Sequence, residues 1–392
     1  MSNYKLESTG QKRLLSLVLL GATSSLFALG AEHSYLYKDP RIMGMGGANV
    51  AVGAYSTSVF SNPAGLTNIK KEHGIVVDLV GIGISVSDAQ DIAEDIDDAG
   101  DDTDKMVDVL EKYNGQAFHI GFDNYTSISK NSDAFAWTIG LLAAVDSNFM
   151  THSSDITLEV SSRGYGGVIL GVAKSYDTQY GQLDVGFGVK YIMQQSYEGK
   201  LDIDDLVSDE DEIADILQEK YEKESSGYGI DIGVVYHPMP NSFWNPAIGM
   251  SILNLGSMDM DNNYGQQPTT INFGASVTPD VPFMNKLVIA VDYVDALDAN
   301  EVRFYNMDES IEDLSESDMM KRIRFGVGMG LFDTTFISST LNVGMYQSAY
   351  TAGVELEFLL FKLSAATYEE EVGTGSATNP DRRYMAKIGI GW

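Results

Sequence analysis

The chain contains no cysteine among its 392 residues. Without thiols it cannot form disulfides, thiolate metal sites or cysteine-based catalytic centres. Basic residues are also scarce, with 25 Lys and Arg against 56 Asp and Glu, and the formal net charge is -31. A surface that binds nucleic-acid phosphates needs clustered Lys and Arg, so no nucleic-acid partner is expected.

Long apolar runs are missing after the first 30 residues. Because a membrane helix needs about 20 apolar residues, none is expected there. The single long run, residues 14–29, follows Lys12-Arg13 and ends in small residues. These features predict a secretory signal peptide over residues 1–30, cleaved after Gly30. A retained N-terminal anchor is the alternative, although the run is short for a full span.

From residue 73 onward, apolar residues alternate with glycine, charged or hydroxyl residues over about ten positions at a time. Such period-two runs are typical of strands that face lipid on one side and a lumen on the other. Counting the runs predicts fourteen strands, an even number, as single-chain bacterial barrels have. The predicted ranges are 73–86, 116–128, 134–146, 155–176, 181–197, 226–238, 245–256, 269–278, 286–297, 321–332, 335–346, 349–359, 361–370 and 382–392.

The connections between these strands give an independent test. Those after odd-numbered strands are long, except at residues 347–348, and those after even-numbered strands are tight. A meander with this alternation places the long loops at one rim, as extracellular loops opposite periplasmic turns. The fold predicted is therefore all-β, a transmembrane antiparallel β-barrel over residues 73–392. A soluble β-sandwich, the alternative, has no reason to alternate in this way.

Two of the long loops, residues 88–113 and 201–223, carry helical patterns rich in Asp and Glu. This charge indicates either a solvated, self-repelling face or a specific cation site. Residues 95–100 approach a calcium loop, but Ala99 stands at a ligand position and Met106 replaces the closing Glu. No defined metal site is predicted, and loose divalent-cation binding that bridges to lipopolysaccharide phosphates stays a hypothesis.

Motifs for catalysis and for cofactors are absent. The five histidines stand alone, without a His-Glu-x-x-His pair, and there is no Gly-x-Ser-x-Gly elbow. Residues 44–49 resemble a dinucleotide fingerprint only superficially, because Asn49 replaces the third glycine and no strand precedes it. We expect neither an enzyme nor a cofactor. The alternative is a barrel phospholipase with Ser and His on its outer wall.

Charged residues recur on the predicted inward faces of the last strands. They indicate either a salt-bridge network that stiffens the barrel or a path for a substrate, and inward charges of the last strand are expected to pair with the two Glu residues. The set comprises Arg322, Arg324, Glu355, Glu357, Arg383 and Lys387.

The segment between the signal and the first strand has two distinctive elements. A glycine-rich run and an Asn-Pro-Ala-Gly turn favour compact, irregular backbone that can fold into the barrel as a plug. We therefore predict an N-terminal hatch over residues 31–72; a periplasmic tail is the alternative. The hatch residues expected are Gly44, Gly46, Gly47, Ala48, Asn62, Pro63, Ala64 and Gly65.

These two elements resemble the N-terminal hatch of the FadL-like outer-membrane transporter superfamily, and more closely that of its TraF-type conjugal transfer relatives. Residues 226–236 and the segment before the last strand, residues 381–384, are also similar, so the likeness spans most of the chain. Residues 54–58, Ala-Tyr-Ser-Thr-Ser, depart from the Asp residues common there, so no role of those acids transfers. The thioredoxin-like protein that shares the TraF name needs a Cys pair, which this chain lacks.

The resemblance implies an outer-membrane barrel of a Gram-negative bacterium for passive uptake of a small, fatty-acid-like hydrophobic compound through a plugged lumen. The alternative is a non-transporting envelope protein of a conjugal transfer or secretion system. Expected partners are outer-membrane lipids and lipopolysaccharide, an apolar ligand, and the barrel-assembly machinery acting on the last strand. In that strand Ile388, Ile390 and Trp392 are predicted to face lipid, with Arg383 and Lys387 inward.

Overall fold

The computed structural model gives this chain as a closed antiparallel β-barrel of fourteen strands, which confirms the predicted fold class and strand number. The expected signal peptide, residues 1–30, and Trp392 lie outside the described residues. The structure describes residues 35–88, 90–100, 102–152, 157–206, 222–262, 264–282, 284–305, 311–315, 318–334, 336–373 and 379–391.

The barrel is a meander in which strands adjacent in sequence are adjacent in space, and β1 closes on β16. Each strand overlaps one predicted range, because the alternation that predicts a strand is the same one that turns its apolar side chains to lipid. The strands are β1 (Ile75–Ser87), β2 (Ala117–Asn131), β3 (Ala136–His152), β4 (Thr157–Thr178), β5 (Gly181–Leu201), β6 (Lys223–His237), β7 (Pro246–Ser257), β8 (Thr270–Val277), β9 (Lys286–Tyr293), β12 (Ile323–Asp333), β13 (Ile337–Tyr346), β14 (Ala349–Phe358), β15 (Phe361–Glu371) and β16 (Pro380–Gly391).

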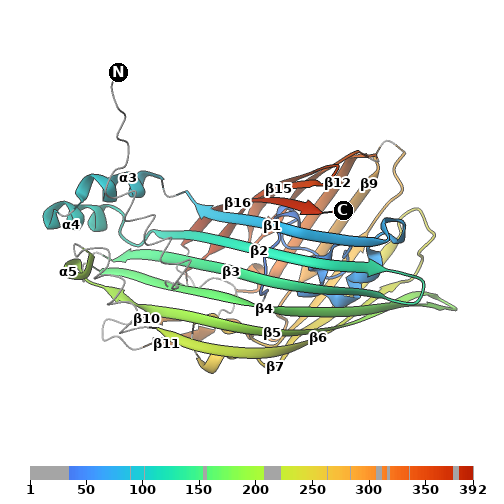
Figure 1. Ribbon diagram of the computed structural model, residues 1–392, viewed down its shortest axis with the longest axis horizontal. Coiled ribbons are helices and arrows are strands. Elements are labelled where there is room, and N and C mark those ends of the chain that lie inside the picture. Colours follow the sequence, from blue (N-terminus) through green and yellow to red (C-terminus); the bar gives the residue numbers. More distant parts are fainter. Residues whose placement is uncertain are drawn as a thin grey trace, which may run out of the picture.

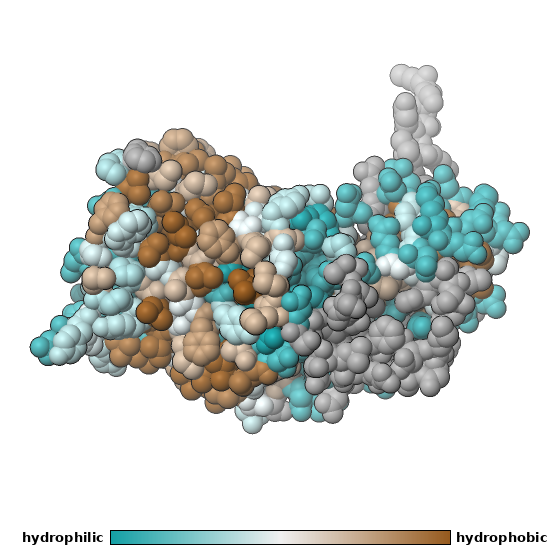
Figure 2. All heavy atoms as spheres, turned by 180° about the vertical axis from the view of Figure 1, so that it is seen from behind, coloured by the Kyte–Doolittle hydropathy of each residue, from teal (hydrophilic) through white to brown (hydrophobic). Residues whose placement is uncertain are grey.

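The outer wall is apolar and the inner wall is not. On β16, Ile388 is 60% exposed and Ile390 40%, whereas the intervening Gly389 is buried. Figure 2 shows hydrophobic residues over the barrel wall and hydrophilic ones over the end that carries the helices. This apolar surface is what a barrel presents to lipid, so the barrel is a transmembrane one. No helix among the described residues is long and apolar enough to cross a membrane.

The long connections gather at one rim, at the left in Figure 1. The predicted helical segment after β1 is two helices, α3 (Gln90–Ala99) and α4 (Thr103–Lys112), because Gly100 adopts a left-handed φ of 55° between them. Of the second helical segment only α5 (Ile203–Leu206) is described. The loop before β12 contains an unexpected hairpin of β10 (Glu301–Tyr305) and β11 (Ile311–Ser315), followed by η5 (Met319–Arg322).

Residues 35–74, here called the N-terminal segment, fold into the barrel up to Ile69 and end in the exposed stretch of residues 70–73. They form α2 (Pro40–Gly44), η1 (Ser56–Phe60), η2 (Pro63–Asn68) and η3 (Lys71–His73), the blue elements in Figure 1. α2 packs against β13 to β16, and η2 packs against β3 to β6. The segment therefore spans the lumen from one wall to the other.

Candidate functional site

The walls receive the N-terminal segment on inward-facing glycines. A Cβ on Gly186 would lie 2.2 Å from the backbone N of Ala64, and one on Gly233 only 1.9 Å from Oδ1 of Asn62. Distances this short leave no room for a side chain, so the wall backbone meets the backbone of Ala64 and the side chain of Asn62 directly. On the opposite wall, Gly326 and Gly344 meet Met45 in the same way.

All eight residues expected to form a hatch lie in the lumen. Gly44 and Gly46 lie against β14 and β12–β13, and Gly46 and Gly47 have φ of 66° and 78°, which glycine adopts without strain. Asn62 and Ala64 lie against β5 and β6. The remaining members are Ala48, Pro63 and Gly65, each buried as well.

The glycine-rich run and the Asn-Pro-Ala-Gly turn are hydrogen-bonded to each other. Nδ2 of Asn62 donates to the carbonyl of Val50 at 2.7 Å, and Nδ2 of Asn49 donates to Oγ of Ser61 at 2.8 Å. Asn62 also caps η2, because its Oδ1 accepts from the N–H of Ala64 at 3.0 Å. The Gly-Gly-Ala and Asn-Pro-Ala motifs therefore build one unit rather than two separate turns.

Asp292 of β9 holds this unit from the wall. One of its carboxylate oxygens accepts the backbone N–H groups of Asn49 at 2.7 Å and of Val50 at 2.8 Å. Both hydrogen bonds are buried, where leaving the two N–H groups without an acceptor would cost free energy. Nothing in the sequence indicates this role; the only signal is that Asp292 interrupts an otherwise apolar strand face.

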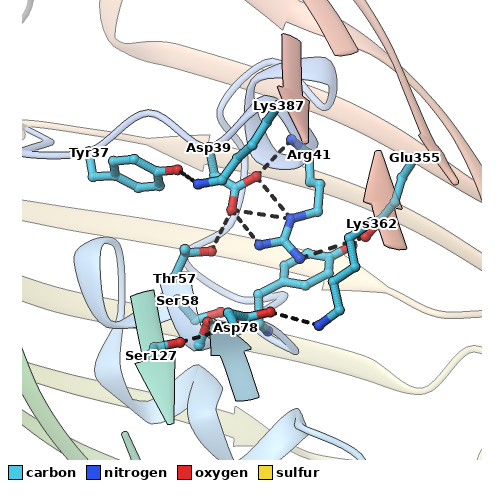
Figure 3. A network of polar contacts seen from close by, with 12 residues as sticks. Tyr37, Asp39, Arg41, Thr57, Ser58, Asp78, Ser127, Glu355, Lys362 and Lys387 are labelled. Carbon is cyan, nitrogen blue, oxygen red and sulfur yellow. Dashed lines mark hydrogen bonds and ion pairs between the residues drawn. The ribbon is translucent and has the colours of Figure 1, made fainter. Parts of the chain in front are cut away.

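A second attachment is built around Asp39, which caps α2 (Figure 3). Its carboxylate accepts from the Arg41 side chain at 2.6 Å and from Oγ1 of Thr57 at 2.8 Å. Arg41 lies 3.7 Å from Glu355 and stacks over the ring of Tyr55, whose hydroxyl donates to Glu355 at 3.2 Å. Burial alone would raise the pKa of Asp39, but the charge and hydrogen bonds of Arg41 outweigh it and hold the pKa below its ordinary value.

Asp78 of β1 attaches the segment at a third point, also visible in Figure 3. It accepts from Oγ of Ser56 at 3.0 Å and pairs with Lys362 of β15 at 2.7 Å. Lys362 reaches it across β16, where the intervening residues Gly389 and Gly391 have no side chains. Gly389 and Gly391 thus leave space on the inner wall for the Asp78–Lys362 ion pair.

The six charged residues do not form the single network expected from sequence. Arg383 and Lys387 pair with neither Glu355 nor Glu357, because β15 separates β16 from β14 and the N-terminal segment fills the space between them. The observed contacts are Arg383 with Asp381 (2.6 Å), Lys387 with Asp123 (3.4 Å) and Tyr37, Glu355 with Arg41, Glu357 with Ser338 (3.4 Å), Arg322 with Asp298 (3.7 Å), and Arg324 with the ring of Tyr346 (4.0 Å).

Among the described residues, two of the histidines have side-chain partners: His237 lies 3.2 Å from Asp184, and His119 lies between two polar side chains. Nε2 of His119 lies 2.7 Å from Oγ of Ser85, and Nδ1 lies 2.7 Å from Oδ1 of Asn148. The order matches a hydrolytic triad, on the inner rather than the outer wall. Yet all three lie on paired strands of the wall, and the backbone N–H of His119 is already bound to Oγ of Ser87 at 2.7 Å. A hydrogen-bonding role in the wall fits this geometry.

The centre of the lumen is an apolar cluster. The rings of Tyr37, Phe60 and Tyr125 lie 5.1–5.7 Å apart, and wall and loop residues complete the cluster. Two small cavities lie beside the segment, one of about 60 Å³ near Tyr37 and one of about 30 Å³ near Arg41. A larger one of about 610 Å³ lies high on β4 to β6. Its lining includes Tyr191 and Met193 from the outer face and Tyr165 and Gln194 from the inner face.

Comparisons with known proteins give a fold but no family. No family model and no curated protein matches the chain. Among solved structures it is similar to the deltaS2 mutant of the TodX monoaromatic hydrocarbon channel, with TM-score 0.55 and 11% identity over 90% of this chain and 98% of that one.

Two further structures give the same result. The toluene transporter TbuX of Ralstonia pickettii has TM-score 0.52 and 13% identity, and the toluene transporter TodX of Pseudomonas putida has TM-score 0.50 and 11% identity. Each comparison covers 90% of this chain and 97% of the other. These neighbours are channels and transporters, not enzymes, and this chain has their fold along nearly its whole described length.

Proposed function

We propose that this chain is a channel for passive entry of a small apolar compound, and that residues 35–74 are its hatch. The observation that carries the proposal is the filled lumen. Wall glycines, Asp292 and the Asp39–Arg41 pair hold the segment across a barrel that, empty, would leak polar solutes. At the apolar cluster in the centre of the lumen, an entering compound has to replace apolar side chains.

The central cluster supports an apolar ligand of ring type. Three aromatic rings meet there at 5.1–5.7 Å, the range in which rings pack favourably against one another. The neighbouring structures are named for monoaromatic hydrocarbons and toluene. Small ring compounds are therefore the first class to test, ahead of the fatty-acid-like compound expected from sequence.

The proposal includes a location and partners. An apolar outer wall and fourteen strands suit the outer membrane of a Gram-negative bacterium, with its lipids and lipopolysaccharide around the barrel. Export would use the signal peptide over residues 1–30. The barrel-assembly machinery would act on β16, whose outward residues Tyr384, Ile388 and Ile390 are apolar or aromatic.

Uptake by intact cells tests the function, because lipopolysaccharide slows apolar compounds that phospholipid alone would pass. Cells that produce the protein should take up the fluorescent apolar probe N-phenylnaphthylamine faster than cells with an empty vector. Entry of a hydrophilic β-lactam should be unchanged. Equal probe uptake in the two strains, or faster entry of both compounds, would contradict a selective apolar channel.

A scaffold in a conjugal transfer or secretion system, as the TraF-type likeness suggests, predicts a different result. Protein purified in detergent should then carry partner proteins, whereas a channel should retain small apolar molecules. Mass spectrometry of the purified barrel distinguishes the two outcomes.

A further inference from the structure

The extracellular loop between β7 and β8 folds into the lumen. Of this loop, residues 258–262 and 264–269 are described, and they include η4 (Met260–Asn262). Met258 is 2% exposed, Met260 0% and Tyr264 2%, although a loop at this rim would ordinarily face water. Met258 and Met260 belong to the same apolar cluster as Tyr37 and Phe60.

The inward face of β5 shows how the loop and the N-terminal segment share the lumen. Near the short-turn end, Gly186 contacts Ala64 and Gly188 contacts Val59. Higher on the same face, Lys190 lies beside Met258 where both approach Gly229, and the side chain of Gln194 donates to the carbonyl of Tyr264 at 2.5 Å. The segment thus closes the lower lumen and the loop closes the upper lumen.

The loop separates the apolar cluster from the large cavity. The cavity of about 610 Å³ is lined by Asp261 of the loop and by Tyr165 and Gln194 of the wall. The residue next to Asp261, Met260, lies in the apolar cluster, and Tyr165 packs against that cluster. Moving Met260 and its neighbours aside would therefore join the cavity to the cluster.

Two features of the loop disfavour its closed arrangement. Asp261 and Met260 adopt left-handed φ of 55° and 48°, which costs free energy in residues other than glycine. Among the described residues, Oε1 of Gln194, Oε1 of Gln267 and Nε of Arg163 are buried at this contact without a hydrogen-bond partner. Unsatisfied buried groups disfavour the closed arrangement.

We propose that the β7–β8 loop is a lid that a small apolar ring compound opens by taking the place of the Met258 and Met260 side chains against Tyr37 and Phe60. Methionine suits this exchange because its flexible thioether packs well on aromatic rings yet adopts many shapes. The inference rests on the proposed function, since it names where the transported compound first binds and what it displaces.

Labelling of an introduced cysteine reports lid opening directly, because the native chain has none. In Met260→Cys the thiol should react slowly with a membrane-impermeant maleimide, and toluene should accelerate the reaction at least severalfold. The matched control is Asp261→Cys, at an exposed neighbouring position, which should react quickly with or without toluene. A Met260→Cys rate that toluene does not change would overturn the proposal.

A disulfide provides the second test. A Cβ on Gly229 would lie 3.1 Å from Cγ of Met258, a spacing suited to a bond between cysteines at these two positions. In the double variant Gly229→Cys/Met258→Cys, oxidation should stop entry of N-phenylnaphthylamine into cells and reduction should restore it. Uptake by each single variant should be unchanged by either treatment. Toluene-dependent labelling in a protein that admits no probe would refute uptake but keep the lid. Probe uptake that continues after the disulfide has formed would refute the lid but remain consistent with a channel.

Discussion

At the scale of single residues, glycine decides where the N-terminal segment can lie. Gly186 is instructive because the atoms nearest to its missing Cβ are backbone atoms of Pro63 and Ala64, not of the wall itself. A side chain at position 186 would collide with the N-terminal segment and leave the packing of the barrel strands unchanged. The position therefore separates attachment of the segment from stability of the strands.

Gly186→Val should loosen the segment, because overpacking at a tight contact costs about 1–3 kcal/mol. We expect trypsin to cleave after Arg41 about tenfold faster than in the native protein, as measured by mass spectrometry of the released peptide. Gly188→Ala is the control, since the nearest atoms to its Cβ would be 3.3 Å away or more. Equal cleavage in Gly186→Val and the native protein would count against the glycine contact.

Asp39 gives a pH dependence of known sign. Its folded-state pKa is below the ordinary value, so its contribution to stability is fully present above the unfolded pKa and is lost as pH falls through the folded one. Since ordinary Asp titrates near about 3.9, Asp39→Asn should lower the melting temperature by a constant amount from pH 5 to 8. The difference from the native protein should shrink only below about pH 4. A difference that vanishes already at pH 6 would contradict this assignment.

The same residues mark how far sequence reasoning reaches. The glycine and Asn-Pro-Ala elements are motifs and could be predicted, together with the inward faces of Arg383 and Lys387. Their partners could not. Asp292 binds backbone N–H groups 243 and 242 residues away, and Arg41 meets Glu355 of β14. The sequence does not show which charged groups pair once a segment fills the space between strands.

At the scale of elements, strands are predictable and loops are less so. The two faces of each strand are set by lipid and lumen, so alternation fixes type and number. The pattern after β1 predicted one helical segment, whereas the structure has two helices there. Asp102 caps the second helix shortly after Gly100. The β10–β11 hairpin is not part of the barrel wall, so lipid does not impose an alternation of apolar and polar residues on it. The inward fold of the β7–β8 loop depends on partners from five strands, β2 to β6.

The cap of α4 is testable by itself. Oδ1 of Asp102 accepts from the N–H of Lys105, and removing an N-cap side chain costs about 1 kcal/mol. Asp102→Ala should therefore accelerate hydrogen exchange of the α4 amides about fivefold and leave exchange in the strands unchanged. Asp104→Ala, an exposed acid within the same first turn that caps nothing, should have a smaller effect. Equal exchange in the two variants would argue that the cap does not form.

At the scale of the molecule, the wall is uneven. β4 and β5 have 22 and 21 residues, while β8 and β9 have 8 each. β4 and β5 extend to the rim of the barrel that carries α3, α4 and α5 in Figure 1. The lumen inside this wall is closed twice, by the N-terminal segment below and the β7–β8 loop above, and both closures meet in one aromatic cluster. Closure to ions together with entry of an apolar compound is the central claim.

Ion conductance in planar bilayers tests this claim most directly. The native protein should conduct almost no current. A variant without residues 41–66 loses the anchored backbone together with Val59 and Phe60, on which the loop packs, so both closures weaken and conductance should rise to that of an open barrel. A deletion variant that folds into the membrane and is no leakier than the native protein would contradict the account.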